Sequence, residues 1–473
     1  MILSGLPSRA SSCGTFVALL VAVLSFSLLQ TMVVPALPDL QRQFGTSPSV
    51  ISWVLSSFLL TSSVGTVLLG RLGDMFGRRR LLLVSLAILG AGTLVCALAE
   101  SVGVLIAGRA VQGLGAATFP LAFGIVRDVF ARERVPVVIG TISAMFGIGF
   151  GVGLIIPGPI VDGLGWRWIF WVSLVVILIA VAAVVAFIGE SVVSKPGRVD
   201  WAGGALLSIG LAALLLAISQ SRSRGVEAAV GLGAVAVVAL AAFAVVQRRV
   251  RHPLIDLAVL RRRPVAAANA TALIIGFGMY GAFTLVPQFV QTPRSAGYGF
   301  GASVTGAGLF LLPMAVTMLF AGPVAGRIGP RLGFHTTLVL ACAVNAVGFV
   351  LFAVGHDAAW CIAVGAGVVG IGIGFAFSSL TNVVIAAVEP RQTGEATGVN
   401  TIVRTLGGSI GSQVSAAIVT ANLVAGTSTP AESGYTTAFV VSAVAMVVAG
   451  LAALASVGRR HTESATAAEH AHA

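Results

Sequence analysis

Two arginines are the charged residues that lie deepest within the apolar runs of this 473-residue chain. Gln112 follows Arg109 by three residues, a spacing that places both side chains on one face of a helix. A charge inside an apolar run is costly and usually functional. Because arginine hardly deprotonates, Arg109 would act on a proton or a substrate through a partner group. The alternative is a structural arginine bonded to neighbouring carbonyls.

Arg404 is the second deep charge and lies within the stretch NTIVRTLGGSIG, residues 400–411. Asn400 comes four residues earlier and shares its helical face. Functional and structural roles are equally compatible with this pattern. The glycines of the same stretch are typical of close helix packing.

Asp74 is the carboxylate with the clearest predicted role. It lies in GRLGDMFGRRR, residues 70–80, four residues before Arg78, so the two can pair on a helix. It can also cap the N-terminus of another helix, because helix N-termini attract anions. We predict a conformational latch here; the alternative is a surface charge that only sets topology. The predicted latch residues are Gly70, Gly73, Asp74, Gly77, Arg78 and Asp128.

The remaining acidic residues fall in loops or at the ends of apolar runs. Asp39 and Glu395 are therefore the alternative proton sites. The single lysine, Lys195, precedes a proline, so the chain has no P-loop for ATP. The cysteines are scattered without metal or redox spacing. We expect no enzyme activity, no metal and no cofactor.

The amino-acid composition indicates what kind of structural elements position these residues. The chain is 57% hydrophobic and 9% charged, with a mean hydropathy of +1.02. Soluble domains are roughly 25% charged, so we predict a protein of the lipid bilayer. The net charge of +12 would suit nucleic acid in a soluble protein. It is spread along the chain as the positive-inside rule requires, so nucleic acid is not an expected partner.

The apolar runs predict an all-α membrane protein with fourteen transmembrane helices. Most of the 28 Lys and Arg residues then lie on one side, which places both termini in the cytoplasm. The predicted spans are 15–36, 50–70, 81–99, 103–125, 137–160, 168–189, 202–219, 227–246, 265–290, 303–323, 335–354, 360–386, 397–420 and 437–457.

An internal repeat divides these spans. GRLGDMFGRRR is echoed by GRIGPRLG at 326–333, and VQGLG at 111–115 is echoed by VVGIG at 368–372. The shift corresponds to eight spans, which predicts two six-helix pseudo-repeats and two inserted central helices. Proline replaces aspartate in the second hairpin, so the latch is one-sided. The predicted domains are an N-terminal half (1–190), the inserted helices with a basic linker (191–264), a C-terminal half (265–458) and a disordered cytoplasmic tail (459–473).

The basic linker, residues 247–264, has two possible arrangements. It can lie on the inner leaflet as an amphipathic segment, with its apolar residues facing lipid. It can equally be an ordered linker. The apolar residues in question are Leu254, Ile255, Leu257, Val259 and Leu260.

The first hairpin resembles the signature between spans 2 and 3 of the major facilitator superfamily. RAVQGLGAATFP (109–120) and GIGFGVGLIIPGPIVDGLGWRWIF (147–170) resemble the span 4 and span 5 signatures of its drug exporters. The fourteen-span layout is similar to its drug:proton antiporter group. The chain departs from that pattern at Leu29, where many members carry aspartate, and at Pro157, which is shifted by one helical turn.

The resemblance implies the major facilitator fold and a proton-driven exporter of small amphipathic compounds, such as drugs, antibiotics or secondary metabolites, in the cell (inner) membrane. The alternatives are an uptake symporter and a membrane sensor with a transporter fold. We expect a monomer, with small molecules and protons as partners. Coupling is predicted at Arg109, Gln112 and Arg404. The predicted substrate cavity contains Gln30, Thr31, Gly149, Gly153, Pro157, Gly158, Tyr280, Gln288, Asn382 and Asn400.

Overall fold

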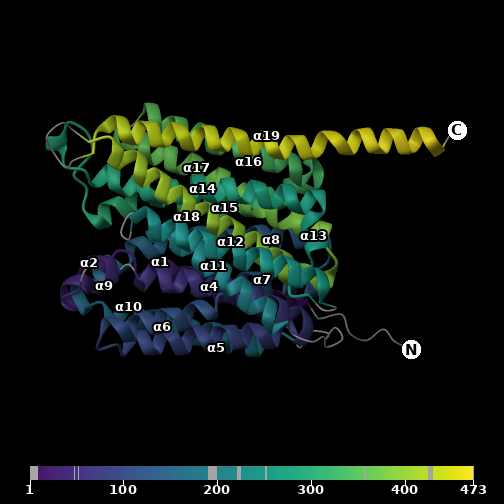
Figure 1. Cartoon of the computed structure of the whole chain (residues 1–473), viewed down its shortest axis with the longest axis horizontal. Coiled ribbons are helices and arrows are strands. Elements are labelled where there is room, and N and C mark those ends of the chain that lie inside the picture. The colour runs from purple at the N-terminus through teal and green to yellow at the C-terminus, as the bar shows by residue number, and fades with distance from the viewer. Residues whose placement is uncertain are drawn as a thin grey trace. The chain divides into compact units, whose positions relative to one another are not determined.

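The computed structural model describes a chain built of helices (Figure 1). Described are residues 9–46, 48–51, 53–189, 200–220, 225–250, 253–355, 358–423 and 430–471. Over these ranges the only β-structure is an isolated bridge between Leu423 and Pro430. The predicted all-α class agrees with this. Lys195 lies outside the described residues, and so do the side chains of the predicted tail, 459–473.

The helices up to residue 250 include the two that flank Gly77 of the first hairpin and the one that carries Arg109. They are α1 (Arg9–Thr31), α2 (Leu37–Gln43), α3 (Pro48–Ile51), α4 (Trp53–Phe76), α5 (Arg78–Ala97), α6 (Val102–Leu114), α7 (Thr118–Val129), α8 (Val135–Ile155), α9 (Pro157–Leu164), α10 (Arg167–Phe187), α11 (Trp201–Gln220) and α12 (Gly225–Arg249).

The helices of the remaining chain include the second hairpin and Arg404. They are α13 (Leu257–Arg261), α14 (Arg263–Gln291), η1 (Arg294–Ala296), α15 (Val304–Leu332), α16 (Phe334–Val354), α17 (Ala359–Ala387), η2 (Pro390–Gln392), α18 (Thr393–Ala421) and α19 (Glu432–Ala471).

Twelve helices among the described residues are long and apolar enough to cross a membrane, with α6 and α7 counted as one stretch. Two predicted spans fall outside this group. The described apolar part of α11 is short, at Ala202–Leu214, and α18 contains several polar residues. The count of fourteen spans therefore stays a prediction.

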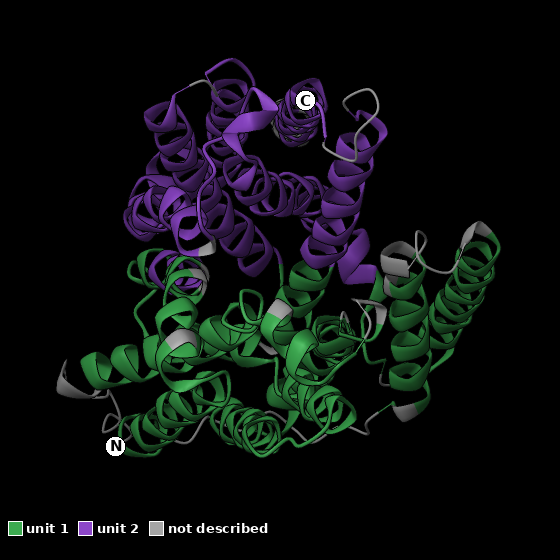
Figure 2. Ribbon diagram, turned by 90° about the vertical axis from the view of Figure 1, so that its left-hand side faces the viewer, with its two compact units in different colours: residues 1–138, 148–257, 388–402 green, residues 139–147, 258–387, 403–473 purple. Residues whose placement is uncertain are grey.

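The chain divides into two compact units, coloured separately in Figure 2. Unit 1 contains residues 1–138, 148–257 and 388–402, and unit 2 contains residues 139–147, 258–387 and 403–473. Neither unit is one continuous stretch. The first ten residues of α18 and residues 388–392 before them belong to unit 1, although residues 258–387 belong to unit 2.

Equivalent helix contacts in the two units support the internal repeat. In unit 1 a Cβ on Gly113 of α6 would overlap Thr61 of α4. In unit 2 a Cβ on Gly370 of α17 would overlap Thr317 of α15 in the same way. These pairs differ by 256 or 257 residues, the offsets of the sequence echoes. Small residues at these positions let the helix backbones approach closely.

The two hairpins also share their backbone turn. Gly77, which precedes α5, has φ 106° and ψ 125°. Gly333, at the equivalent place before α16, has φ 85° and ψ 135°. A side chain is rarely compatible with such positive φ values, so both turns require glycine.

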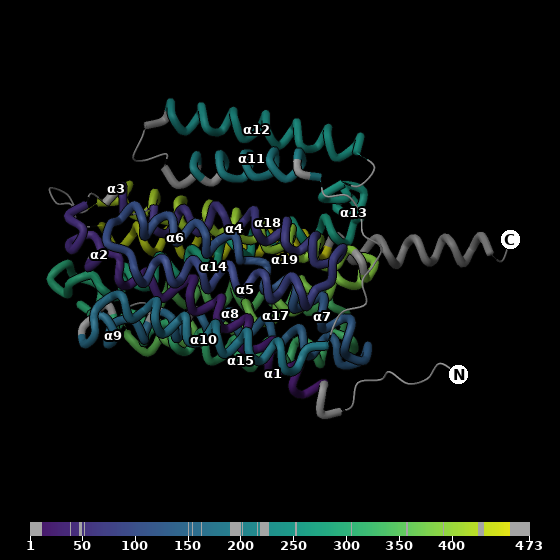
Figure 3. Tube along the Cα trace, turned by 90° about the horizontal axis from the view of Figure 1, so that it is seen from below, coloured from purple at the N-terminus to yellow at the C-terminus, as the bar shows by residue number. Residues whose placement is uncertain are grey.

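The inserted helices pack mainly on each other within unit 1. α11 and α12 lie side by side, and α11 also packs on α4 (Figure 3). Only 17% of the most apolar window of α12 is buried in the protein, which leaves its surface for lipid.

The linker after α12 is an ordered segment that packs on protein. Leu254, Ile255 and Val259 are only 2%, 3% and 1% exposed. The lipid-facing arrangement is therefore wrong for these three residues, because protein contacts already bury them. Their burial agrees with the alternative prediction, an ordered linker.

The shifted proline interrupts the predicted fifth span. α8 ends at Ile155 and α9 begins at Pro157, with Ile156 between them. Proline lacks the N–H that would continue the ladder of hydrogen bonds, so the break falls directly before it.

Candidate functional site

Arg78 is the centre of the cluster at the first hairpin, in unit 1. Its Nε and Nη2 donate to Asp74 Oδ1 at 3.0 and 2.7 Å. Its Nη1 donates to Asp128 Oδ1 at 2.6 Å and to the carbonyl of Gly124 at 3.0 Å. These charge-assisted bonds fix the position and the orientation of the Arg78 guanidinium. The structure therefore brings together the three charged residues predicted for the latch.

The second oxygen of Asp74 caps the N-terminus of α18. Oδ2 accepts from the backbone N–H groups of Gly394 and Glu395 at 3.0 and 3.2 Å. Arg78 Nη2 also donates to the carbonyl of Pro390, directly before this helix. A carboxylate at this place satisfies unpaired N–H groups and interacts favourably with the helix dipole. The predicted capping contact is thus present, to a segment 320 residues away.

Two further arginines bind the same segment. Arg127 donates to Thr393 Oγ1 at 2.8 Å and to the carbonyl of Val388 at 3.0 Å. Arg71 pairs with Glu395 through Nη1 and Oε2 at 3.1 Å. Residues 388–395 are therefore bound by three cations and one carboxylate of the first hairpin and its neighbouring turn.

Glycines allow this close approach. A Cβ on Gly70 would lie 3.0 Å from the carbonyl oxygen of Gly394, and a Cβ on Gly73 would overlap Leu121. The hairpin signature thus combines its charges with residues small enough for the backbones to meet. Of the six predicted latch residues, Gly77 acts through its turn and the others through these contacts.

Arg109 is fully buried in unit 1 and binds two other helices. Its Nε donates to the carbonyl of Val54 at 3.0 Å, and its Nη1 donates to the carbonyl of Leu29 at 3.3 Å and to Gln112 Oε1 at 2.8 Å. The guanidinium lies 4.2 Å from the centre of the Phe58 ring. The predicted Arg109–Gln112 pair is therefore present.

No described carboxylate pairs with Arg109, and its Nη2 has no hydrogen-bond partner within the described structure. Leu29 is the position where the resemblance implies aspartate. Its backbone carbonyl receives a bond from Arg109, so the backbone at this position lies next to the guanidinium. Within the described part of the chain this buried cation has no carboxylate counter-ion, and cation–π contact with Phe58 offsets part of the cost.

Arg404 is the second deep charge predicted from the sequence, and it belongs to unit 2. Its guanidinium lies 4.1 Å from the ring centre of Phe377 and 5.9 Å from that of Phe146. Among the described residues it forms no ion pair. Ser378, beside Phe377, has a buried hydroxyl that lacks a partner in this part of the structure.

The cavity residues predicted in unit 1 lie mostly in helix contacts. Thr31 Oγ1 donates to the carbonyl of Gly149 at 3.0 Å. A Cβ on Gly153 would overlap Thr31. These residues therefore hold α1 against α8. Asn400 is buried, Pro157 is buried at the start of α9, and Gln30 and Gly158 are half-buried.

The cavity residues predicted in unit 2 differ in their burial and contacts. Asn382 is buried and donates to the carbonyl of Ser378 at 2.8 Å. Tyr280 is half-buried, with its ring against Gly408. Gln288 is exposed near the end of α14.

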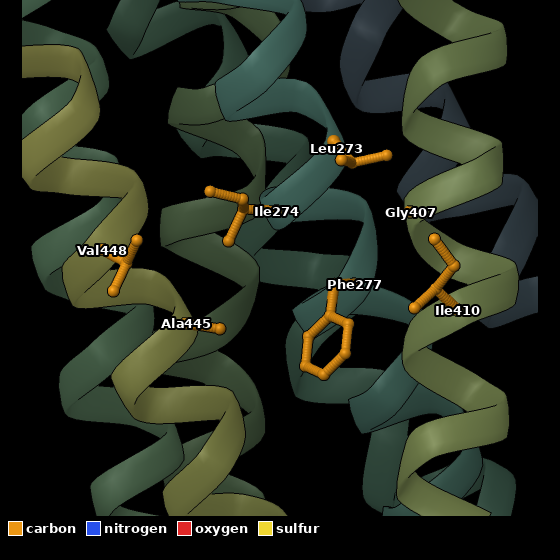
Figure 4. Close-up of a pocket in the computed structure, with 7 residues that line it drawn as sticks. All are labelled: Leu273, Ile274, Phe277, Gly407, Ile410, Ala445 and Val448. Carbon is orange, nitrogen blue, oxygen red and sulfur yellow. The ribbon is translucent and has the colours of Figure 1, made fainter.

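A pocket of about 240 Å³ lies between α14, α18 and α19 in unit 2 (Figure 4). Its lining is apolar and includes Phe277; none of the predicted polar residues lines it. Val448 and Ile410 are 50% and 37% exposed, so the pocket opens on an apolar surface. The lining residues are Leu273, Ile274, Phe277, Gly407, Ile410, Ala445 and Val448.

Sequence reasoning missed part of the hairpin cluster. Glu395 was considered only as a proton site, and Thr393, Pro390 and Arg127 were not assigned to the latch. The only sequence signal for these residues was a polar, proline-containing turn directly before a helix, at residues 388–395. No local spacing connects that turn with residue 74.

Comparison with known proteins decides the family. Residues 19–412 match the model of the Major Facilitator Superfamily. The chain belongs to the major facilitator superfamily. This transporter is accordingly a multi-pass membrane protein of a family that carries small molecules and consists of transporters rather than enzymes.

Two curated relatives and one solved structure illustrate the similarity. Multidrug resistance protein Stp of Mycobacterium tuberculosis (strain CDC 1551 / Oshkosh) is 31% identical over 371 residues, covering 77% of this transporter and 68% of the relative. Multidrug resistance protein 3 of Bacillus subtilis (strain 168) is 27% identical over 403 residues, covering 84% and 77%. The human organic anion transporter MFSD10 (TETRAN) has a TM-score of 0.65 at 17% identity, covering 94% of this chain and 99% of that chain. This last likeness concerns the fold alone.

Proposed function

We propose that this transporter exports small amphipathic or hydrophobic compounds through alternating access, driven by proton influx. The observation that carries the proposal is the similarity, over most of the chain, to two multidrug resistance proteins of different bacteria. The apolar pocket and the arginines stacked on phenylalanine rings support it, because amphipathic ligands bind apolar sites with few polar groups.

The hairpin cluster serves in this proposal as the cytoplasmic latch of the transport cycle. Asp74 and Arg78 close it: Arg78 donates to Asp128, and Asp74 accepts from the backbone N–H groups at the N-terminus of α18. Arg109, Gln112 and Arg404 take part in coupling. The predicted polar residues, from Gln30 on α1 to Asn400 on α18, contact substrate during the cycle.

The architecture that goes with this function has fourteen spans and both termini in the cytoplasm. The inserted helices and the linker separate two six-helix halves, residues 1–190 and 265–458. The protein acts as a monomer in the cell membrane. Export fits the absence of a charged ligand set among the predicted cavity residues, which a symporter for a polar nutrient would need.

The test compares the wild type with Asp74→Asn in an efflux-deficient host. The side-chain amide of the variant would turn an N–H toward groups that are themselves N–H donors, and the charge that binds Arg78 would be lost. We expect the wild type to raise resistance to several amphipathic drugs and to lower ethidium accumulation. In everted vesicles, substrate should relieve a preformed proton gradient. Asp74→Asn should lower the efflux rate at least about tenfold while ligand-induced thermal stabilisation of the purified protein persists.

The matched control is Glu133→Gln, which removes an exposed acid from the turn after α7. It should transport like the wild type. Accumulation of the compounds instead of resistance would indicate uptake. A wild type that moves no compound of the panel in either direction would contradict the proposal.

A further inference from the structure

Glu395 is a buried carboxylate that the latch itself does not require. It is 2% exposed, and Asp74 is the other acid that is buried within the described residues. Its Oε2 accepts from Arg71 at 3.1 Å, and its Oε1 accepts from the backbone N–H of Asp256 at 2.5 Å. Glu395 thus joins the first hairpin to the linker that follows α12.

The linker is bound on its other side by the inserted helices. The backbone N–H of Ile255, next to Asp256, donates to Gln247 Oε1 at 3.3 Å. Gln247 lies on α12, is 5% exposed, and donates through Nε2 to Asp200 Oδ2 at 2.6 Å. Asp200 Oδ1 in turn accepts from the N–H of Gly203 in the first turn of α11 at 2.8 Å.

Continuous bonds therefore run from the start of α11, through α12 and the linker, to Glu395 and Arg71. Asp256 and Glu395 also lie close to places where the chain passes from one unit to the other, at 257/258, 387/388 and 402/403. A conformational change of a transporter requires bending at a few such segments. A hydrogen bond to the backbone N–H of Asp256 therefore restricts the motion of one of them.

We propose that Gln247 and Glu395 clamp the linker at Ile255 and Asp256, so that the inserted helix pair holds the hairpin cluster closed. This rests on the proposed function only in that the cluster is the latch of the transport cycle. The inserted pair is then a brace for the latch, with Gln247 and Glu395 as positioning residues.

The clamp depends on proton concentration through Glu395, which lies in the first turn of α18, ahead of the predicted span 397–420. The pKa of Glu395 is raised to about 7, chiefly by burial and also by the charges of Asp74 and Asp256, against the opposing effects of Arg71 and the N–H of Asp256. A carboxyl whose pKa is higher when buried binds its proton more tightly in the clamped state. The clamp is therefore stronger below pH 7 and weakens as the pH rises through that value.

Hydrogen exchange tests the clamp without any transport assay. In the purified full-length protein, the amides of Ile255 and Asp256 report the clamp, and those of Gly394 and Glu395 report the cap by Asp74. Gln247→Leu removes the bond to Ile255 and touches neither Asp74 nor Arg78. We expect this variant to accelerate exchange about tenfold at Ile255 and, decisively, also at Gly394 and Glu395.

The proton dependence has its own comparison. After correction for the intrinsic rate, exchange at Gly394 and Glu395 should rise about tenfold from about pH 6 to about pH 8 in the wild type. Glu395→Gln keeps an oxygen that accepts from Asp256 but cannot ionise, so its exchange should stay flat. Glu389→Gln removes an exposed acid from the same segment and should behave like the wild type.

Each outcome decides the proposal. Exchange at Gly394 and Glu395 that is unchanged in Gln247→Leu would overturn the brace, and an equal pH response in Glu395→Gln would overturn the role of Glu395. If Gln247→Leu fails to elute as a folded protein, Glu395→Ala provides the same comparison at Asp256. A wild type that moves no drug would contradict the proposed function but leave these exchange rates as the test of the clamp.

Discussion

At the scale of single residues, the charges of this transporter differ in how they are neutralised. Asp74 and Arg78 neutralise each other and bind backbone groups as well. Arg109 has carbonyl and aromatic partners but no carboxylate among the described residues. A buried cation of this kind is costly, and such charges in membrane proteins usually serve function. The structural alternative for Arg109 has real support, because its bonds join α6 to α1 and α4.

Substitution of Arg109 separates the two roles. Arg109→Ala should abolish ethidium efflux while membrane abundance holds, and Arg109→Lys should retain less than about a tenth of the rate. Lysine keeps the charge but lacks the planar fork that binds Val54 and Leu29 together. Efflux and immunoblots of the membrane fraction measure these outcomes. Arg42→Ala, at an arginine side chain that is 80% exposed, is the control; full transport by Arg109→Ala would refute a functional role.

At the scale of elements, the repeat is expressed as turns and helix contacts rather than as identical side chains. Gly77 and Gly333 form the same turn, whereas Asp74 is replaced by Pro330 in the second hairpin. The turn is needed in both hairpins because each joins two antiparallel membrane helices. The carboxylate is needed once, because only the first hairpin caps α18.

Alanine at the two turns tests this division. Gly77→Ala and Gly333→Ala should each destabilise the protein by roughly 1–3 kcal/mol, because both backbones require positive φ. Thermal melting in detergent measures the loss. Gly163→Ala is the matched control, since a Cβ at Gly163 would meet no atom within 4 Å. Equal melting temperatures in all three variants would show that the turns tolerate a side chain.

At the scale of the whole molecule, the inserted helices decide the topology. α12 is long and apolar enough to cross a membrane, but the described apolar part of α11 is short. If both span, the start of α12 lies outside and its end lies inside. If neither spans, both ends of α12 are cytoplasmic.

Cysteine labelling in intact cells distinguishes these topologies. In a variant without native cysteines, a membrane-impermeant maleimide should label Glu227→Cys and leave Arg249→Cys unlabelled until the cells are opened. Both positions are exposed, at opposite ends of α12. Labelling of neither position in intact cells would contradict the fourteen-span arrangement.

The sequence alone determined the features that depend on local properties. Apolar run length predicts membrane helices, because a helix must cover the hydrocarbon thickness. Glycines recur at the same places in GRLGDMFG and GRIGPRLG, so the two hairpins are recognisable as a repeat. The i, i+4 spacing of Asp74 and Arg78 predicts their pairing, and the i, i+3 spacing of Arg109 and Gln112 predicts theirs.

Only the tertiary structure decided which distant segments these residues bind. The cap of Asp74 on α18 joins residues 320 positions apart, and the bond of Asp256 to Glu395 joins residues 139 positions apart. Spacing in the sequence carries no signal for such contacts, because they depend on how packed helices bring loops together. The same packing buries Leu254 and Ile255, whose apolar character alone is equally compatible with lipid and with protein.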